Sequence, residues 1–215
     1  LAQKEGYAEP DPTFDIEGMD AAHKIGILSS LAFGTPLPPD DFYVEGISAI
    51  KKIDFKYAKE MGYTVKHLAV CKKNENKIEL RAHPVLIQEN SYLANLKSVR
   101  NGIEVETDLL GTLHIAGSGA GQESTASGVV SDLVHLANSN INISQSIKKY
   151  KSDLIDFLSL SFQYYFYIKA EDIPGVMASI TAMFAEKKVG IESIVQKEDL
   201  KAVSYTHLRA HETES

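Results

Sequence analysis

The chain has 215 residues, of which 44% are hydrophobic and 24% are charged, a balance that excludes a disordered or fibrous protein. No apolar run reaches the roughly 20 residues that cross a bilayer, and a formal charge of −7 gives no general attraction to nucleic acid or anionic membranes. The single cysteine, Cys71, excludes an internal disulfide and a multi-thiolate zinc site, so we expect a reducing compartment, the cytoplasm.

The first part of the chain has helical patterns. It begins at Leu1 rather than methionine and shows no signal-peptide pattern, which indicates a piece of a longer protein. Apolar residues at helical spacing predict a helix over residues 17–34, with Gly34 and Pro36 as terminators. A second helix is predicted over residues 53–61, before Gly62.

After Gly62 the period changes to that of β-strands. Alternating residues predict strands over 64–72, 77–86 and 103–115, with a hairpin loop at 74–76. Asn101-Gly102 and Gly111 are typical of turns, so we expect the last strand to form two pieces. A glycine-rich loop over 117–121 then opens a third helix, whose apolar residues share one face: Ala126, Val129, Val130, Leu133 and Leu136.

A polar segment divides the chain. Its composition predicts a linker over residues 138–162, between a domain at 1–137 and a module at 163–200. The module contains a strand over 164–169, a helix over 176–187 and a strand over 190–196. Residues 201–215 follow neither period, so we predict a non-native tail outside the fold. The fold class expected is α/β (α+β), a mixed sheet with covering helices followed by a truncated β-α-β module.

Candidate site residues lie near the start. Asp20 and Lys24 are four apart on the predicted helix, so their side chains meet on one face. Glu9 and Asp15 lie on or after a proline-bracketed segment that can aim carboxylates at a cationic group such as a substrate amine. Spacing alone favours the alternative of a surface ion pair worth about 0.3–0.5 kcal/mol.

The same segment carries a longer pattern. Residues 6–24 contain, in order, Gly6-Tyr7-Ala8, Asp11-Pro12, Asp15-Ile16, Gly18, Asp20 and Lys24. This set resembles the signature segment of homoserine dehydrogenases, and the resemblance extends over residues 1–137 as the family's substrate and dimerisation domain. It implies that Lys24 and Asp20 are catalytic, that Glu9, Asp15 and Asp20 bind substrate, and that Gly6, Gly119 and Gly121 contact the cofactor. It assigns no metal ligands.

The resemblance also implies a reaction. The family interconverts L-homoserine and L-aspartate 4-semialdehyde with NAD or NADP, in the biosynthesis of threonine, methionine and isoleucine. An alcohol oxidation removes a hydride from carbon and a proton from oxygen, and a lysine amine can take that proton. The family's N-terminal nucleotide-binding domain is missing from the sequence, so we expect these 215 residues alone to be inactive. A homo-oligomer without nucleic-acid or membrane partners is expected.

The C-terminal module resembles part of an ACT regulatory domain. Residues 172–176 stand at the usual ligand loop, which implies threonine as a candidate effector. Two alternatives to the enzyme remain open at this point: a non-catalytic amino-acid-binding ACT protein, and a dimerisation scaffold.

Overall fold

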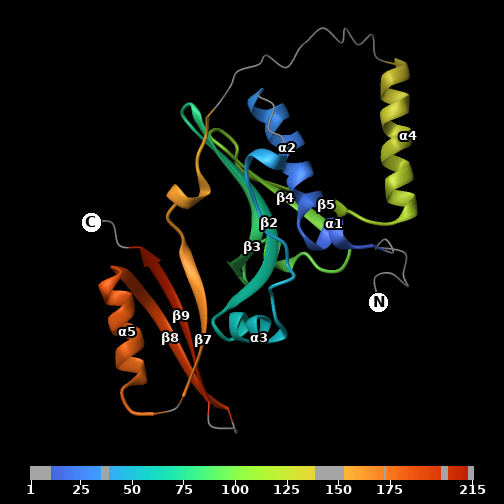
Figure 1. Cartoon of the computed structure of the whole chain (residues 1–215). Helices are drawn as coiled ribbons and strands as arrows, with labels where there is room; N and C mark the ends of the chain where they lie inside the picture. The colour runs from blue at the N-terminus through green and yellow to red at the C-terminus, as the bar shows by residue number, and fades with distance from the viewer. Residues whose placement is uncertain (1–10, 35–38, 139–152, 172, 200–202, 213–215) are drawn as a thin grey trace. The chain divides into compact units, whose positions relative to one another are not determined.

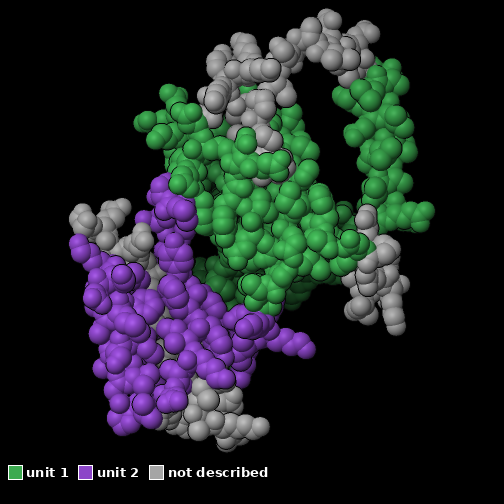
Figure 2. Space-filling model, in the orientation of Figure 1, with its two compact units in different colours: residues 1–50, 58–157 green, residues 51–57, 158–215 purple. Residues whose placement is uncertain are grey.

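The computed structural model describes residues 11–34, 39–138, 153–171, 173–199 and 203–212. The chain divides into two units, residues 1–50 with 58–157 and residues 51–57 with 158–215 (Figure 2). In the described part of the chain, no helix combines the length and apolar character that a membrane crossing needs. The expected Gly6 and Glu9 lie outside the described residues.

The first unit is built on one long hairpin (Figure 1). Strands β2 (Tyr63–Asn74) and β3 (Lys77–Gln88) pair in antiparallel register from Tyr63 opposite Gln88 to Asn74 opposite Lys77. The turn places Glu75 at φ 53, and residues 75 and 76 alone connect the strands. On the other edge of β3, the short strands β1 (Tyr43–Val44) and β6 (Asp153–Leu154) pair in parallel. Thus β3 is central, and residues 153–154 of the predicted linker form a strand.

A second hairpin belongs to the same unit. Strands β4 (Arg100–Thr107) and β5 (Gly111–Ser118) pair with each other, so the predicted division of the last strand near Gly111 is confirmed. The turn predicted at Asn101-Gly102 is wrong, because these residues pair inside β4 with Gly117 and Ala116. A Cβ at position 102 would overlap Leu96 beside the 3-10 turn η2 (Leu93–Asn95), so this glycine leaves room for a packed leucine.

The predicted helices are confirmed. A short α1 (Thr13–Ile16) precedes α2 (Met19–Phe33), which ends where Gly34 at φ 68 donates its N–H to the Ser30 carbonyl. Helix α3 (Lys52–Glu60) follows the 3-10 turn η1 (Pro39–Asp41) and β1, and α4 (Gln122–Asn138) follows β5. Helices α2 and α3 begin and end within two residues of their predicted bounds. Helix α4 begins at Gln122, directly after the glycine-rich loop expected to open it.

Helix α2 contacts the sheet through small side chains. Its buried residues are Ala22, Gly26 and Ser29. Of its large apolar residues, Ile27, Leu28 and Leu31 are 41% to 70% exposed, whereas Ile25 and Phe33 are partly buried. Small residues let the helix backbone approach β2 and β3 closely. The core beneath it contains Ile78 and Leu80 of β3, against which partly buried residues pack: Ile25, Phe33, Phe42, Cys71 and Leu154.

Helix α4 has the predicted apolar stripe but no buried residue in its described length. Its valines and leucines, from Val129 to Leu136, are between 55% and 60% exposed. A helix without packed neighbours relies on its own backbone hydrogen bonds, which are marginal at this length in water.

The second unit contains a three-stranded sheet. Its elements are β7 (Gln163–Glu171), the 3-10 turn η3 (Phe157–Ser159) just before it, α5 (Val176–Glu186), β8 (Val189–Asp199) and β9 (Val203–Glu212). The strand order is β7-β9-β8, with β9 antiparallel to both neighbours. The strand, helix and strand predicted for the module are confirmed. Phe184 of α5 meets Phe166 of β7 edge to face, with ring centroids 5.1 Å apart.

The expectation that the last residues stand outside the fold is wrong. Residues 203–212 form the central strand β9, hydrogen-bonded on both sides. The sequence there lacks clean alternation, but it contains Val203, Tyr205 and Thr206, which favour strands, and backbone pairing does not depend on side-chain pattern. The origin of this segment and the domain boundaries stay predictions.

One partly buried hydrogen bond joins β7 to the start of α3 within the second unit. Asp54 accepts the Lys51 N–H on Oδ2 at 2.7 Å and the Tyr165 hydroxyl on Oδ1 at 3.1 Å. Burial, followed by the charge of Asp54, raises the pKa of Tyr165. The Asp54 carboxylate therefore caps the start of α3 and at the same time binds the Tyr165 hydroxyl.

We predict that Tyr165→Phe lowers the free energy of unfolding by about 0.5–1.5 kcal/mol, because Asp54 loses a hydroxyl donor. Urea denaturation of the 215-residue chain measures the difference. Tyr164→Phe is the control, since Tyr164 is 40% exposed on the same strand and its ring lies against Phe162 and Phe166. Equal midpoints for the two variants would contradict the prediction.

Candidate active site

The segment before α2 is shaped by local hydrogen bonds. Asp11 accepts both the backbone N–H and the hydroxyl of Thr13 on Oδ1, at 3.1 and 2.6 Å. The hydroxyl, then the N–H, lowers the pKa of Asp11. Pro12 follows as the cap of α1, and its carbonyl accepts the N–H groups of Asp15 and Ile16. The proline-bracketed segment thus leads directly into a helical turn that carries Asp15, which is exposed.

The predicted acid–ammonium pair is present on α2. Lys24 Nζ lies 2.5 Å from Asp20 Oδ2, one helical turn apart. The side chains are 56% and 39% exposed, respectively, so this ion pair contributes little to stability. What the geometry provides is an ammonium group oriented by a carboxylate and accessible to a ligand.

The other predicted site residues have different surroundings. Asp15 lies on α1, within the same segment as the pair. Gly119 donates its N–H to the Val99 carbonyl at 2.9 Å, and the Gly121 carbonyl accepts the Thr125 N–H at 3.1 Å at the start of α4. Gly121 thus begins the hydrogen bonding of α4, whereas Gly119 is bound to the segment before β4. Among the described residues, no group of three His, Cys, Asp or Glu side chains is arranged to hold a metal ion.

Sequence reasoning missed the contacts that hold the turn between α1 and α2. Ile47 donates its N–H to the Ile16 carbonyl at 2.8 Å, and the Ser48 hydroxyl donates to Glu17 Oε1. His67 Nε2 lies 2.8 Å from the Glu45 carbonyl oxygen, beside this turn. These partners are 22 to 31 residues apart along the chain, so no local pattern signals them.

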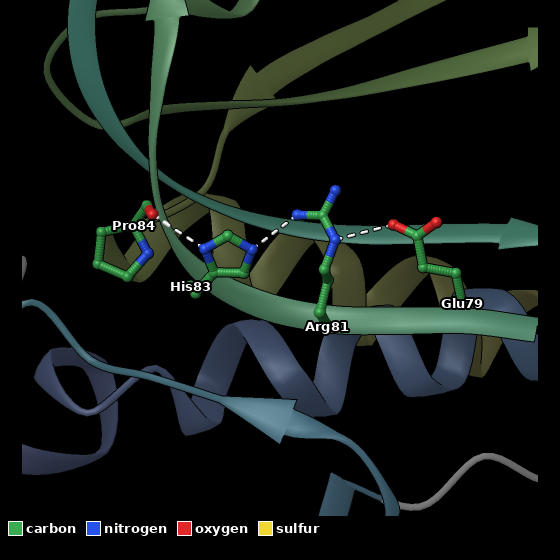
Figure 3. A network of polar contacts seen from close by, with 4 residues as sticks. All are labelled: Glu79, Arg81, His83 and Pro84. Atoms are coloured by element: carbon green, nitrogen blue, oxygen red, sulfur yellow. Dashed lines mark hydrogen bonds and ion pairs between the residues drawn. The ribbon is translucent and has the colours of Figure 1, made fainter. Parts of the chain in front are cut away.

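A second cluster of titratable groups lies on β3 (Figure 3). Glu79 and Arg81 are 7% and 9% exposed, and Arg81 Nε lies 2.8 Å from Glu79 Oε1. The Arg81 guanidinium also lies 2.7 Å from His83 Nε2, while His83 Nδ1 lies 2.9 Å from the Pro84 carbonyl. A guanidinium only donates and a carbonyl only accepts, so His83 is neutral with its proton on Nδ1. Glu79, Arg81, His83 and the Pro84 carbonyl thus form a structural network in which each group hydrogen-bonds to the next.

We predict that acid destabilises the fold through His83. Burial, the largest cause, lowers the pKa of His83 from its ordinary 6.5, although the Pro84 carbonyl opposes this. Between the lowered and the ordinary pKa the unfolded chain binds more protons, so the free energy of unfolding falls as pH falls below about 6.5.

His83→Gln keeps an acceptor for Arg81 without titrating in this range, so it should flatten the fall in stability. Thermal or urea unfolding between about pH 7.5 and 5.5 measures the slope. His135→Gln, on an exposed position of α4, is the control. A slope unchanged in His83→Gln would show that another group causes the acid sensitivity.

Comparison with known proteins places this arrangement among dehydrogenases. The structure superposes on that of a homoserine dehydrogenase from Thiobacillus denitrificans with a TM-score of 0.85 and 41% identity, covering 98% of this chain and 50% of that one. A homoserine dehydrogenase from S. aureus gives a TM-score of 0.69 at 25% identity, covering 99% of this chain and 52% of that one.

Sequence comparison defines the family. The homoserine dehydrogenase family model matches residues 1–134. A homoserine dehydrogenase of Pseudomonas aeruginosa is 43% identical over 206 residues, which cover 92% of this chain and 48% of the relative. The chain belongs to the homoserine dehydrogenase family, and it spans about half the length of the curated relatives that it matches. The expected fold class, a mixed α/β structure, is confirmed.

Proposed function

We propose that the chain is the substrate-binding half of a homoserine dehydrogenase, in which Lys24 and Asp20 handle the proton of the alcohol. The observation that carries the proposal is the 2.5 Å contact between Lys24 Nζ and Asp20 Oδ2 on an exposed helix face, inside the region that the family model matches. Family membership favours the dehydrogenase over an amino-acid sensor or a scaffold, and no observation favours either alternative.

The chemistry assigned to these residues is proton transfer. When homoserine is oxidised to aspartate 4-semialdehyde, the hydroxyl loses its proton as the carbon loses a hydride. An uncharged Lys24 amine accepts that proton, and Asp20 orients Nζ and stabilises the ammonium that forms. Glu9 binds the substrate ammonium group and Asp15 supports the carboxylate set, because carboxylates are the partners that the ammonium of an amino acid needs.

NAD or NADP accepts the hydride when it is bound. The loop before α4 suits one edge of such a nucleotide at Gly121, which takes φ 115 where the backbone turns into the helix, whereas the Asn101 side chain fills the space beside Gly119. Its fit is limited, since the Gly119 N–H already donates to Val99. We therefore assign Gly6, Gly119 and Gly121 a contact with the nucleotide and no larger share of its binding.

The remaining assignments rest on the family resemblance. We propose that the parent enzyme acts in the cytoplasm, as a homo-oligomer, in threonine, methionine and isoleucine biosynthesis. Residues 163–200 are proposed as part of an ACT module with threonine as effector. The support is the strand–helix–strand order of β7, α5 and β8, with Gly175 at φ 94 where α5 begins.

Replacing the lysine tests the proposal. In the full-length protein encoded by the reading frame that contains this sequence, Lys24→Ala should lower kcat for NAD(P)-dependent homoserine oxidation by roughly 10²- to 10⁴-fold, the usual contribution of a general base. Lys59→Ala, an exposed lysine on α3, is the matched control. Activity of Lys24→Ala within about twofold of the control would overturn the assignment.

The 215-residue chain on its own supplies a second test. We expect it to show no homoserine oxidation with NAD or NADP, because its only proposed nucleotide contacts are Gly6, Gly119 and Gly121. Spectrophotometric detection of NAD(P)H formation measures this. Turnover by this chain would contradict the limited cofactor role assigned here.

A further inference from the structure

The pairing of β1 with β3 leaves one carbonyl without a partner in the sheet. Tyr43 and Val44 pair with Arg81 and Ala82, and the Glu45 N–H continues the ladder by donating to the Ala82 carbonyl at 2.8 Å. In a parallel ladder the next bond would run from the N–H of residue 84 to the Glu45 carbonyl. Residue 84 is proline and has no N–H, so the sheet cannot satisfy that carbonyl.

His67 supplies the missing donor. It lies on β2 directly opposite Pro84, and its Nε2 is 2.8 Å from the Glu45 carbonyl oxygen. A carbonyl only accepts, so Nε2 carries the proton in this bond. The chain after Glu45 then leaves the sheet through the buried Gly46, while the imidazole stays fixed beside it.

The same imidazole sets the position of the turn before α2. Gly18 is buried at φ 81, and a Cβ there would lie 2.7 Å from His67 Nε2 and 3.2 Å from the Glu45 carbonyl oxygen. Only a residue without a side chain fits between the helix turn and the imidazole. The Gly18 carbonyl accepts the N–H of Ala22 at 3.0 Å, so Gly18 also begins the hydrogen bonding of α2.

The segment after β1 also contacts the turn before α2. Gly46 packs so closely against Ile16 and Glu17 that a Cβ would overlap their backbones. Ile47 binds the Ile16 carbonyl, and Ser48 binds the Glu17 carboxylate. The turn is thus held between β2 and the segment that follows β1.

We infer that His67 is a positioning residue for the Asp20–Lys24 pair. The pair lies two and six residues after Gly18, with side chains 56% (Lys24) and 39% (Asp20) exposed among the described residues. Farther along, α2 packs on the sheet through small buried side chains and through Ile25 and Phe33, whereas its first turn is held at Gly18. The contact between His67 and the Gly18 turn therefore fixes where the helix starts and where Lys24 Nζ lies. This inference rests on the proposed function.

The test uses the full-length enzyme and His67→Leu, which removes the donor. We expect kcat/KM for homoserine to fall on the order of 10- to 100-fold, the scale of a small misplacement of a catalytic group, with the KM for the nicotinamide nucleotide unchanged. His67→Gln, whose side-chain amide reaches the place of Nε2, should restore most of the loss. A purely structural role would instead lower the fraction of active enzyme and leave KM for homoserine unaltered.

Lys66→Met is the matched control. Lys66 is next to His67 on β2 but lies on the opposite face of the sheet, and its Nζ also donates to a backbone carbonyl, that of Leu96 at 2.6 Å. Its loss should change unfolding temperature without changing kcat/KM for homoserine. An equal fall in kcat/KM for Lys66→Met and His67→Leu would overturn the inference.

A double mutant separates this inference from the proposed function. If His67 acts through Lys24, His67→Leu costs nothing further in a Lys24→Ala background. A full additional cost there would overturn the positioning role while leaving the lysine assignment intact. If Lys24→Ala alone keeps normal activity, the proposed function itself fails.

Discussion

Strand β3 is hydrogen-bonded along both edges, and β1, β2, β6 and α2 of the first unit are arranged around this constraint. Its even-numbered residues, including Ile78 and Leu80, form the core beneath α2. On the opposite face, Glu79, Arg81 and His83 are polar and at least partly buried, and they pair with one another: Glu79 with Arg81, and Arg81 with His83. The same strand therefore carries both the apolar core and the buried ionic row.

The position of the candidate active site is set by buried contacts at the turn before α2, and not by the contact between Asp20 and Lys24. The Asp20–Lys24 ion pair is exposed and worth only about 0.3–0.5 kcal/mol as a helix pair. The buried contacts lie at the Gly18 turn, where α1, α2, β2 and the segment after β1 meet. Stability and chemistry are thus separated: buried backbone contacts fix the helix, and the helix presents side chains whose interactions remain available to a ligand.

Local patterns predicted the local structure well. The period of 3.6 residues and Gly34 defined α2, and alternation defined β2 and β3 with their tight turn. Asp20 and Lys24 meet because residues four apart on a helix are neighbours on the same face. The predictions failed where distant contacts decide: Gly102 lies in a strand beside Leu96, and residues 203–212 form a strand because two neighbours offer it hydrogen bonds. The bond between His67 and Glu45 depends on a proline in a third segment, which no local pattern reveals.

Pro84 has an effect that reaches beyond its own strand. Any other amino acid at this position would bring a second donor within range of the Glu45 carbonyl, in competition with the imidazole. β1 would then lengthen by one ladder step, and the imidazole would share the Glu45 carbonyl oxygen with the new N–H. Because Pro84 has no N–H, β1 extends no further along β3, and the Glu45 carbonyl is left to the imidazole of His67 beside the helix turn.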